Sequence, residues 1–195
     1  MTEKHRGKMR RFMVHLVNER HSPKDAAKLL ADARAILEEG DLVVRDTRVS
    51  TKYIEYDISM PPGTDERPYF GKLEAISPVA SFEEVIEKHL PKAEAIKLAV
   101  KSFNAEKYWN AHEYLEGVWK ETSGSEKSVL NGIILVAAAF VHDEKDEPDI
   151  CISILKRAIE KFEGSSGAYH GIDTGRIRAK VAEIIASGEI RRFAI

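Results

Sequence analysis

The spacing of the apolar residues changes near Pro91, and this change constrains the fold more than any other feature of the chain. Before Pro91, short segments alternate apolar and polar residues, which is typical of a sheet with one covered face. After Pro91, apolar residues recur every three or four positions, which is the period of an amphipathic helix. The sequence therefore predicts an α+β protein with two small domains, residues 1–90 and residues 91–195.

The first domain is predicted to be a small α+β layer of a ferredoxin-like kind. The clearest strand is 52–60, in which Ile54, Tyr56 and Ile58 alternate with polar residues. The expected strands are 11–18, 42–48, 52–60 and 70–77. One helix is expected from Ser22-Pro23 onward, and a second from Ser81, because Ser81 and Glu84 form a capping-box signature.

The second domain is predicted to be an all-helical bundle. Its expected helices are 92–102, 106–121, 126–143, 147–162 and 173–186. The helix 126–143 is apolar nearly all round, which is normal for the central helix of a bundle. Its most apolar stretch, Val129 to Val141, has about 13 residues, whereas a membrane-spanning helix needs roughly 20. No membrane association is therefore expected.

The charge balance and the cysteine content limit the classes of function. The chain has 30 basic and 32 acidic residues, and each half, divided after Leu90, has 15 basic and 16 acidic ones. Neither half resembles a strong nonspecific nucleic-acid binder. The single cysteine, Cys151, is expected to be a core thiol, which fits a reducing compartment. Residues 1–8 lack the apolar core of a signal peptide, so a cytoplasmic location is expected.

A histidine and a glutamate interrupt the apolar face of the helix 106–121. His112 lies at the edge of that face, and Glu116 follows one turn later, so the two side chains are neighbours. His142 is a polar exception on the apolar helix 126–143. Together, His112, Glu116 and His142 could bind a divalent transition metal and leave one coordination position for water. Such a site could support hydrolysis, with Glu116 and His112 as the candidate catalytic residues.

Other interpretations of the same residues remain open at this point. His112 and Glu116 could form a buried hydrogen-bonded cluster that fixes the register of the helices, or a metal-free acid–base pair. The bundle could be a non-catalytic scaffold that binds a protein partner or forms a homo-oligomer. RNA could bind the sheet through Tyr53 and a basic arm, although the charge balance makes nucleic acid an improbable partner. The arm contains Lys4, Arg6, Lys8, Arg10 and Arg11.

A set of spaced residues in the second half resembles the signature of domain of unknown function 309. The set is Phe103-Asn104, Tyr108, Ala111-His112-Glu113, Leu115-Glu116 and Trp119, extended by Gly132-Ile-Ile-Leu, His142 and Gly171-Ile-Asp173. The resemblance covers about residues 93–186 and implies an all-helical fold with no established activity. Asn131 departs from the family pattern, in which Gln is more frequent before the glycine. The first domain lies outside the resemblance.

Overall fold

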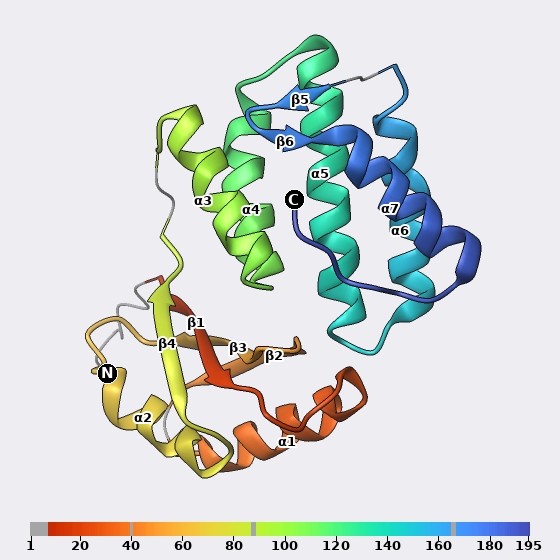
Figure 1. Ribbon diagram of the computed structural model, residues 1–195. Helices are drawn as coiled ribbons and strands as arrows, with labels where there is room; N and C mark the ends of the chain where they lie inside the picture. Colours follow the sequence, from red (N-terminus) through yellow and green to blue (C-terminus); the bar gives the residue numbers. More distant parts are fainter. Residues whose placement is uncertain (1–7, 40, 87–88, 165–166) are drawn as a thin grey trace. The chain divides into compact units, whose positions relative to one another are not determined.

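A computed structural model describes residues 8–39, 41–86, 89–164 and 167–195 (Figure 1). The packing of the Cα atoms divides the chain into two compact units, Met1–Glu87 and Lys88–Ile195. We call them the sheet unit and the helical unit, and we describe each by itself. A four-stranded antiparallel sheet with helices is followed by a cluster of helices, which confirms the predicted α+β class.

The sheet unit has the element order of a ferredoxin-like fold. Its elements are β1 (Arg10–Val17), α1 (Ala26–Ile36), β2 (Val43–Val49), β3 (Tyr53–Met60), α2 (Arg67–Lys72) and β4 (Val79–Glu84). Short 3-10 turns, Pro23–Asp25 and Leu73–Ala75, precede α1 and follow α2. The strands are ordered β2-β3-β1-β4, and all neighbours are antiparallel. This β-α-β-β-α-β order with crossovers over one strand confirms the ferredoxin-like prediction.

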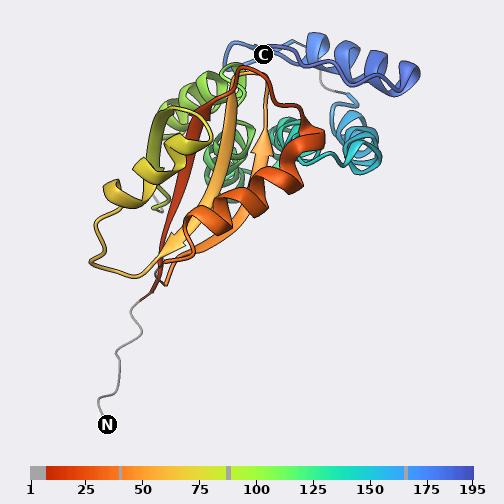
Figure 2. The ribbon, with the colours of Figure 1, turned by 90° about the horizontal axis from the view of Figure 1, so that it is seen from below.

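Both helices of the sheet unit cover the same face of its sheet (Figure 2). Leu29 of α1 and Phe70 of α2 are buried in one apolar cluster with the strands. The strand residues on this face are mainly Phe12, Val14, Leu16, Ile54, Tyr56 and Ile58. The alternation in residues 52–60 therefore correctly identified the core face of β3.

Two predicted elements of the sheet unit were wrong. Residues 70–77 do not form a strand, because α2 and the following 3-10 turn bury Phe70 and Leu73 at helical spacing. Residues from Ser81 do not begin a helix but lie in β4, where Phe82 pairs with Val14 of β1. The Ser-x-x-Glu pattern here is strand alternation, and the pairing with β1 outweighs the local capping signal.

The helical unit contains the five predicted helices. They are α3 (Lys92–Asn104), α4 (Tyr108–Lys120), α5 (Gly124–Asp143), α6 (Pro148–Lys161) and α7 (Thr174–Ser187). A short hairpin, β5 (Ala168–Tyr169) with β6 (Ile172–Asp173), precedes α7 and was not predicted. Its two turn residues have positive φ, 48° at His170 and 86° at Gly171, as in the two-residue turns that fit hairpin twist.

The helix α5 lies between α4 and α6 in the centre of the helical unit (Figure 1). Most of its apolar side chains are buried, including Ile133, Val136 and Phe140. By length and composition alone this helix could cross a membrane, but half of its most apolar 18-residue stretch is buried inside the protein. The central helix of a bundle has the same length and apolar composition, and the burial of α5 identifies it as such a helix.

Candidate metal site

The apolar face of α4 determines where the candidate ligands lie. The residues of this face that are buried in the core of the helical unit are Tyr108, Ala111, Leu115 and Val118. Because this face is fixed against the core, the side chain of His112 lies at its border and remains 26% exposed.

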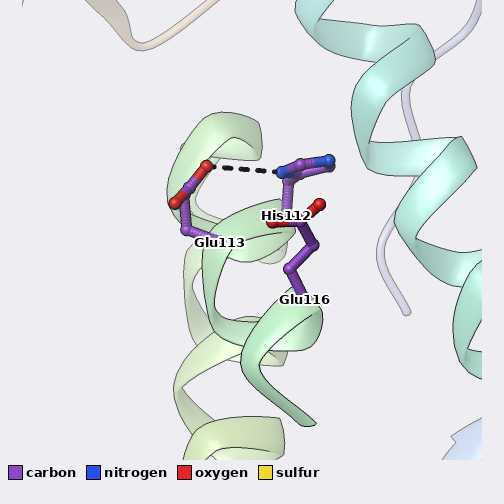
Figure 3. Close-up of side chains that lie close together, drawn as sticks. All are labelled: His112, Glu113 and Glu116. Carbon is purple, nitrogen blue, oxygen red and sulfur yellow. Dashed lines mark ion pairs between the residues drawn. The ribbon is translucent and has the colours of Figure 1, made fainter. Parts of the chain in front are cut away.

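Three side chains of α4 form a compact group of potential metal ligands. One ligand atom each from His112, Glu113 and Glu116 lies within 4.8 Å of the other two. The Nδ1 atom of His112 is 3.6 Å from a carboxylate oxygen of Glu113. Figure 3 shows the Glu113 carboxylate facing the imidazole from one side, with Glu116 reaching back toward it along the helix. The structure thus brings together His112 and Glu116, and adds Glu113.

The described residues place few hydrogen bonds within the protein on this group. Within the described part of the chain, the side chains of His112 and Glu116 make no hydrogen bond, and the distance from His112 to Glu113 is too long for one. The hydrogen bond from His112 to Glu116 that a register-fixing cluster requires is therefore absent among these residues. The nitrogen and carboxylate oxygens are in this respect available to a ligand.

The donor set fits a divalent transition metal. One imidazole nitrogen and two carboxylates are ligands that zinc, iron and manganese accept. Metal–ligand bonds of about 2.1 Å in tetrahedral geometry place two ligands roughly 3.4 Å apart. The widest pair in the group, at most 4.8 Å apart, must therefore close by no more than roughly 1.4 Å. Glu113 is 45% exposed, so its side chain has space to move toward the other two ligands.

His142 takes part in a different interaction. It lies near the end of α5, and its Nδ1 atom is 2.5 Å from a carboxylate oxygen of Glu147. Glu147 is the residue before the first turn of α6, so this pair links the end of α5 to the beginning of α6. His142 is not a member of the three-residue group on α4. Its predicted role as a third metal ligand stays a prediction.

The other residues that carry the family resemblance have evident structural roles. Phe103 and Tyr108 pack edge to face, with ring centroids 5.0 Å apart. The side chain of Asp173 accepts a hydrogen bond from the backbone N–H of Arg176 and so caps α7. A Cβ atom on Gly132 would lie 2.7 Å from the ring of Phe162, so only glycine allows this ring to pack against α5. His112, Glu113 and Glu116 have no comparable role.

Asn104 makes a long-range contact that the sequence analysis did not predict. Its amide nitrogen donates to the carbonyl of Ile195, at 3.0 Å, and its amide oxygen accepts from the N–H of Ile195, at 2.9 Å. The two partners are 91 positions apart in the chain, so no local pattern indicates the contact. The only signal was the Phe-Asn pair in the family signature.

The sheet unit contains a second group of ionisable residues, on the face opposite to its two helices. Glu55 is buried and contacts Arg48 and His15, the latter at 2.7 Å. Burial by itself would raise the pKa of Glu55, but the charge of Arg48 and the hydrogen bonds from His15 and Arg48 outweigh it and lower this pKa to about 2. His15 is itself buried in the sheet unit.

The basic arm is only partly within the described residues, because residues 1–7 lie outside them. Arg10 forms ion pairs with Glu84 and Glu66, and Arg11 pairs with Asp57. The two arginines are therefore neutralised by carboxylates of the same unit, which does not favour a polyanion as their partner.

Cys151 lies on α6 and is fully buried. Burial raises the pKa of its thiol to about 12, so the reactive thiolate is scarce at neutral pH. The predicted role as a core thiol agrees with this environment.

The fold and the site define an α+β protein whose helical unit presents a histidine–carboxylate group on one helix. Residues 96–154, from α3 into α6, match the model of the family described as Domain of unknown function (DUF309). An uncharacterized protein of Aquifex aeolicus (strain VF5) is 30% identical over 99 residues, which are 50% of this chain and 30% of that relative. The chain thus spans less than a third of the curated relative. The resemblance seen in the sequence is confirmed over residues 96–154 of the helical unit.

Proposed function

We propose that the helical unit binds one divalent transition metal through His112 and Glu116, with Glu113 as the third protein ligand. The observation that carries this proposal is the proximity of three ligand atoms, within 4.8 Å of one another, on a helix whose opposite face is locked in the core. The absence of side-chain hydrogen bonds at His112 and Glu116, among the described residues, supports it.

The chemistry of such a site follows from its ligand count. Three protein ligands leave at least one position of a four-coordinate metal open to water. A bound metal supplies Lewis-acid chemistry and lowers the pKa of a coordinated water to about 7, which suits hydrolysis. The partial exposure of His112 gives water access to this position. Glu113 is the most exposed of the three, and its carboxylate would be the group that could accept a proton at such a site.

The location that fits this proposal is the cytoplasm. The thiol of Cys151 is free and buried, as is usual in reducing compartments. In the described residues, α5 is the one helix apolar enough to raise the question of a membrane, and it forms the core of the bundle.

The proposal is tested by titrating metal-free protein with zinc(II), manganese(II) and iron(II) in competition with a chromophoric chelator. The wild type is expected to bind one ion per chain. His112→Ala and Glu116→Gln are expected to weaken binding by about 100-fold or more, since loss of even an outer partner of a ligand costs roughly 10–100-fold. Circular dichroism shows whether each variant keeps its helices.

Matched variants identify the third ligand and control for charge. Glu113→Gln and His142→Ala compare the two candidates, and the proposal expects only Glu113→Gln to weaken binding. Glu121→Gln, just beyond the same helix, and the exposed His89→Ala are expected to bind as the wild type does. Equal affinity of wild type, His112→Ala and Glu116→Gln would refute the site. Loss of binding only in His142→Ala would show that the metal site lies on α5 and not on α4.

A further inference from the structure

Side-chain contacts hold the segment that follows α7 to the rest of the helical unit. We call residues 189–195 the C-terminal segment. The helix α7 ends at Gly188, whose left-handed backbone (φ 70°) redirects the chain. The segment has no regular secondary structure. In Figure 1 it runs back across the bundle and ends between α4 and α5.

Ion pairs hold the middle of this segment. The guanidinium of Arg192 contacts Glu106, at 3.1 Å, and Asp143, at 3.0 Å. All three side chains are less than one-fifth exposed. Charge-assisted hydrogen bonds with this degree of burial are stronger than ion pairs on an open surface. The two acids therefore form a specific site for an arginine.

An aromatic contact and a backbone clamp follow directly after Arg192. The ring of Phe193 packs against Phe140 and Phe103, with centroids 5.5 Å and 6.1 Å away. The amide of Asn104 then holds both backbone groups of Ile195. A side-chain amide that donates to and accepts from the backbone of one residue can bind an extended segment whatever side chain that residue carries.

These five residues, Phe103, Asn104, Glu106, Phe140 and Asp143, come from α3, α5 and the connection between α3 and α4. We call them the acidic–aromatic groove. The C-terminal segment contacts this groove through Arg192, Phe193 and Ile195. A cavity of about 170 Å³ lies between the segment and α7, lined by Lys180, Ile184 and Phe193 among others.

We propose that the acidic–aromatic groove is a binding site for an extended protein segment in which arginine is followed by phenylalanine. The C-terminal segment of the chain occupies the groove and is displaced when a partner supplies the same chemistry. The groove provides an acidic pair for the arginine, two aromatic rings for the phenylalanine and an amide for the backbone, as peptide-binding surfaces do. This inference is independent of the proposed metal site.

The covalent connection determines how the displacement is measured. A segment tethered by a short linker competes at an effective concentration in the millimolar range, so a partner segment binds the wild type only weakly. Weakening the tethered segment without altering the groove must therefore increase the affinity for a segment added in trans. This increase distinguishes a binding groove from a merely structural contact.

The probe is a fluorescein-labelled peptide with the sequence of residues 188–195, Gly-Glu-Ile-Arg-Arg-Phe-Ala-Ile, amidated at its end. Binding is measured by fluorescence anisotropy with three full-length proteins. They are the wild type, a segment variant (Arg192→Ala with Phe193→Ala), and a groove variant that adds Glu106→Gln and Asp143→Asn to the segment variant. A control peptide carries alanine at the two positions that correspond to Arg192 and Phe193.

The segment variant is expected to bind the probe at least about tenfold more tightly than the wild type does. The groove variant and the control peptide are expected to lose this binding. If the segment variant is less stable, the probe is expected to raise its melting temperature toward that of the wild type. A segment variant that neither binds the probe nor gains stability from it overturns the proposal, as does equal binding by the groove variant.

Discussion

At the scale of single residues, Glu55 has the most strongly shifted pKa among the carboxyl groups in the described part of the sheet unit. Its pKa is lowered to about 2, whereas an unfolded chain gives glutamate a pKa of about 4.3. The folded state therefore holds this group ionised more firmly than the unfolded state does. Its contribution to stability is fully present above about pH 4.5 and is lost as the pH falls toward 2.

Replacing Glu55 by glutamine is expected to lower the free energy of unfolding by about 3 kcal/mol at pH 7, because buried Arg48 loses its buried carboxylate partner and keeps the more exposed Asp46, 3.3 Å away. The difference from the wild type is expected to shrink as the pH falls from about 4.5 to about 2. Urea unfolding at several pH values measures it. Glu38→Gln, at an exposed position, is the control and is expected to change stability little at any pH. A difference that does not depend on pH would contradict the assigned ionisation.

At the scale of elements, the packing of α5 against α6 depends on the absence of one side chain. The ring of Phe162, just after α6, lies where a Cβ atom on Gly132 would be. Gly117, in the middle of α4, has open space around the corresponding position. Alanine substitution at the two glycines therefore distinguishes two effects on stability. At Gly132 the new methyl group clashes with Phe162, whereas at Gly117 it only improves helix propensity.

Gly132→Ala is expected to destabilise the protein by about 1–3 kcal/mol, because Phe162 must move. Gly117→Ala is expected to stabilise it by up to about 1 kcal/mol, since alanine replaces glycine inside a helix without a clash. Chemical denaturation of both variants measures the two effects. Adding Phe162→Leu to Gly132→Ala should recover part of the loss. Equal effects of the two alanine substitutions would contradict the described packing.

Only some of the helices and strands could be predicted from the sequence. Helices such as α4 were predicted because their own apolar spacing specifies both the element and its buried face. The order of α2 and β4 was predicted wrongly. The capping signal at Ser81 is local, whereas the pairing of Phe82 with Val14 joins distant parts of the chain. The contact of Asn104 with Ile195 escaped prediction for the same reason.

The candidate site was accessible from the sequence only in part. The spacing of His112 and Glu116 predicts neighbours on one helix, and the structure brings them together. The participation of Glu113 was not predicted, because a helical wheel directs it toward solvent and does not show how far its side chain reaches. The partner of His142 was also not predicted, because it depends on how the chain turns from α5 into α6.

At the scale of the whole molecule, each of the two units has an apolar core of its own. The proposed division into two domains predicts that residues 1–90 and residues 91–195 fold when they are produced separately. Each fragment is expected to unfold in one cooperative transition in calorimetry and to keep its secondary structure by circular dichroism. A fragment that is unfolded alone but folds when the other is added would show that the chain is one cooperative domain.

The central claim is that the helical unit binds a metal at His112, Glu113 and Glu116. Elemental mass spectrometry tests it most directly, on untagged full-length protein dialysed against zinc(II) or manganese(II) and then against buffer without metal. We expect about one ion per chain in the wild type, and almost none in folded His112→Ala. A wild type that retains no metal, or a His112→Ala variant that retains as much as the wild type, would contradict the claim.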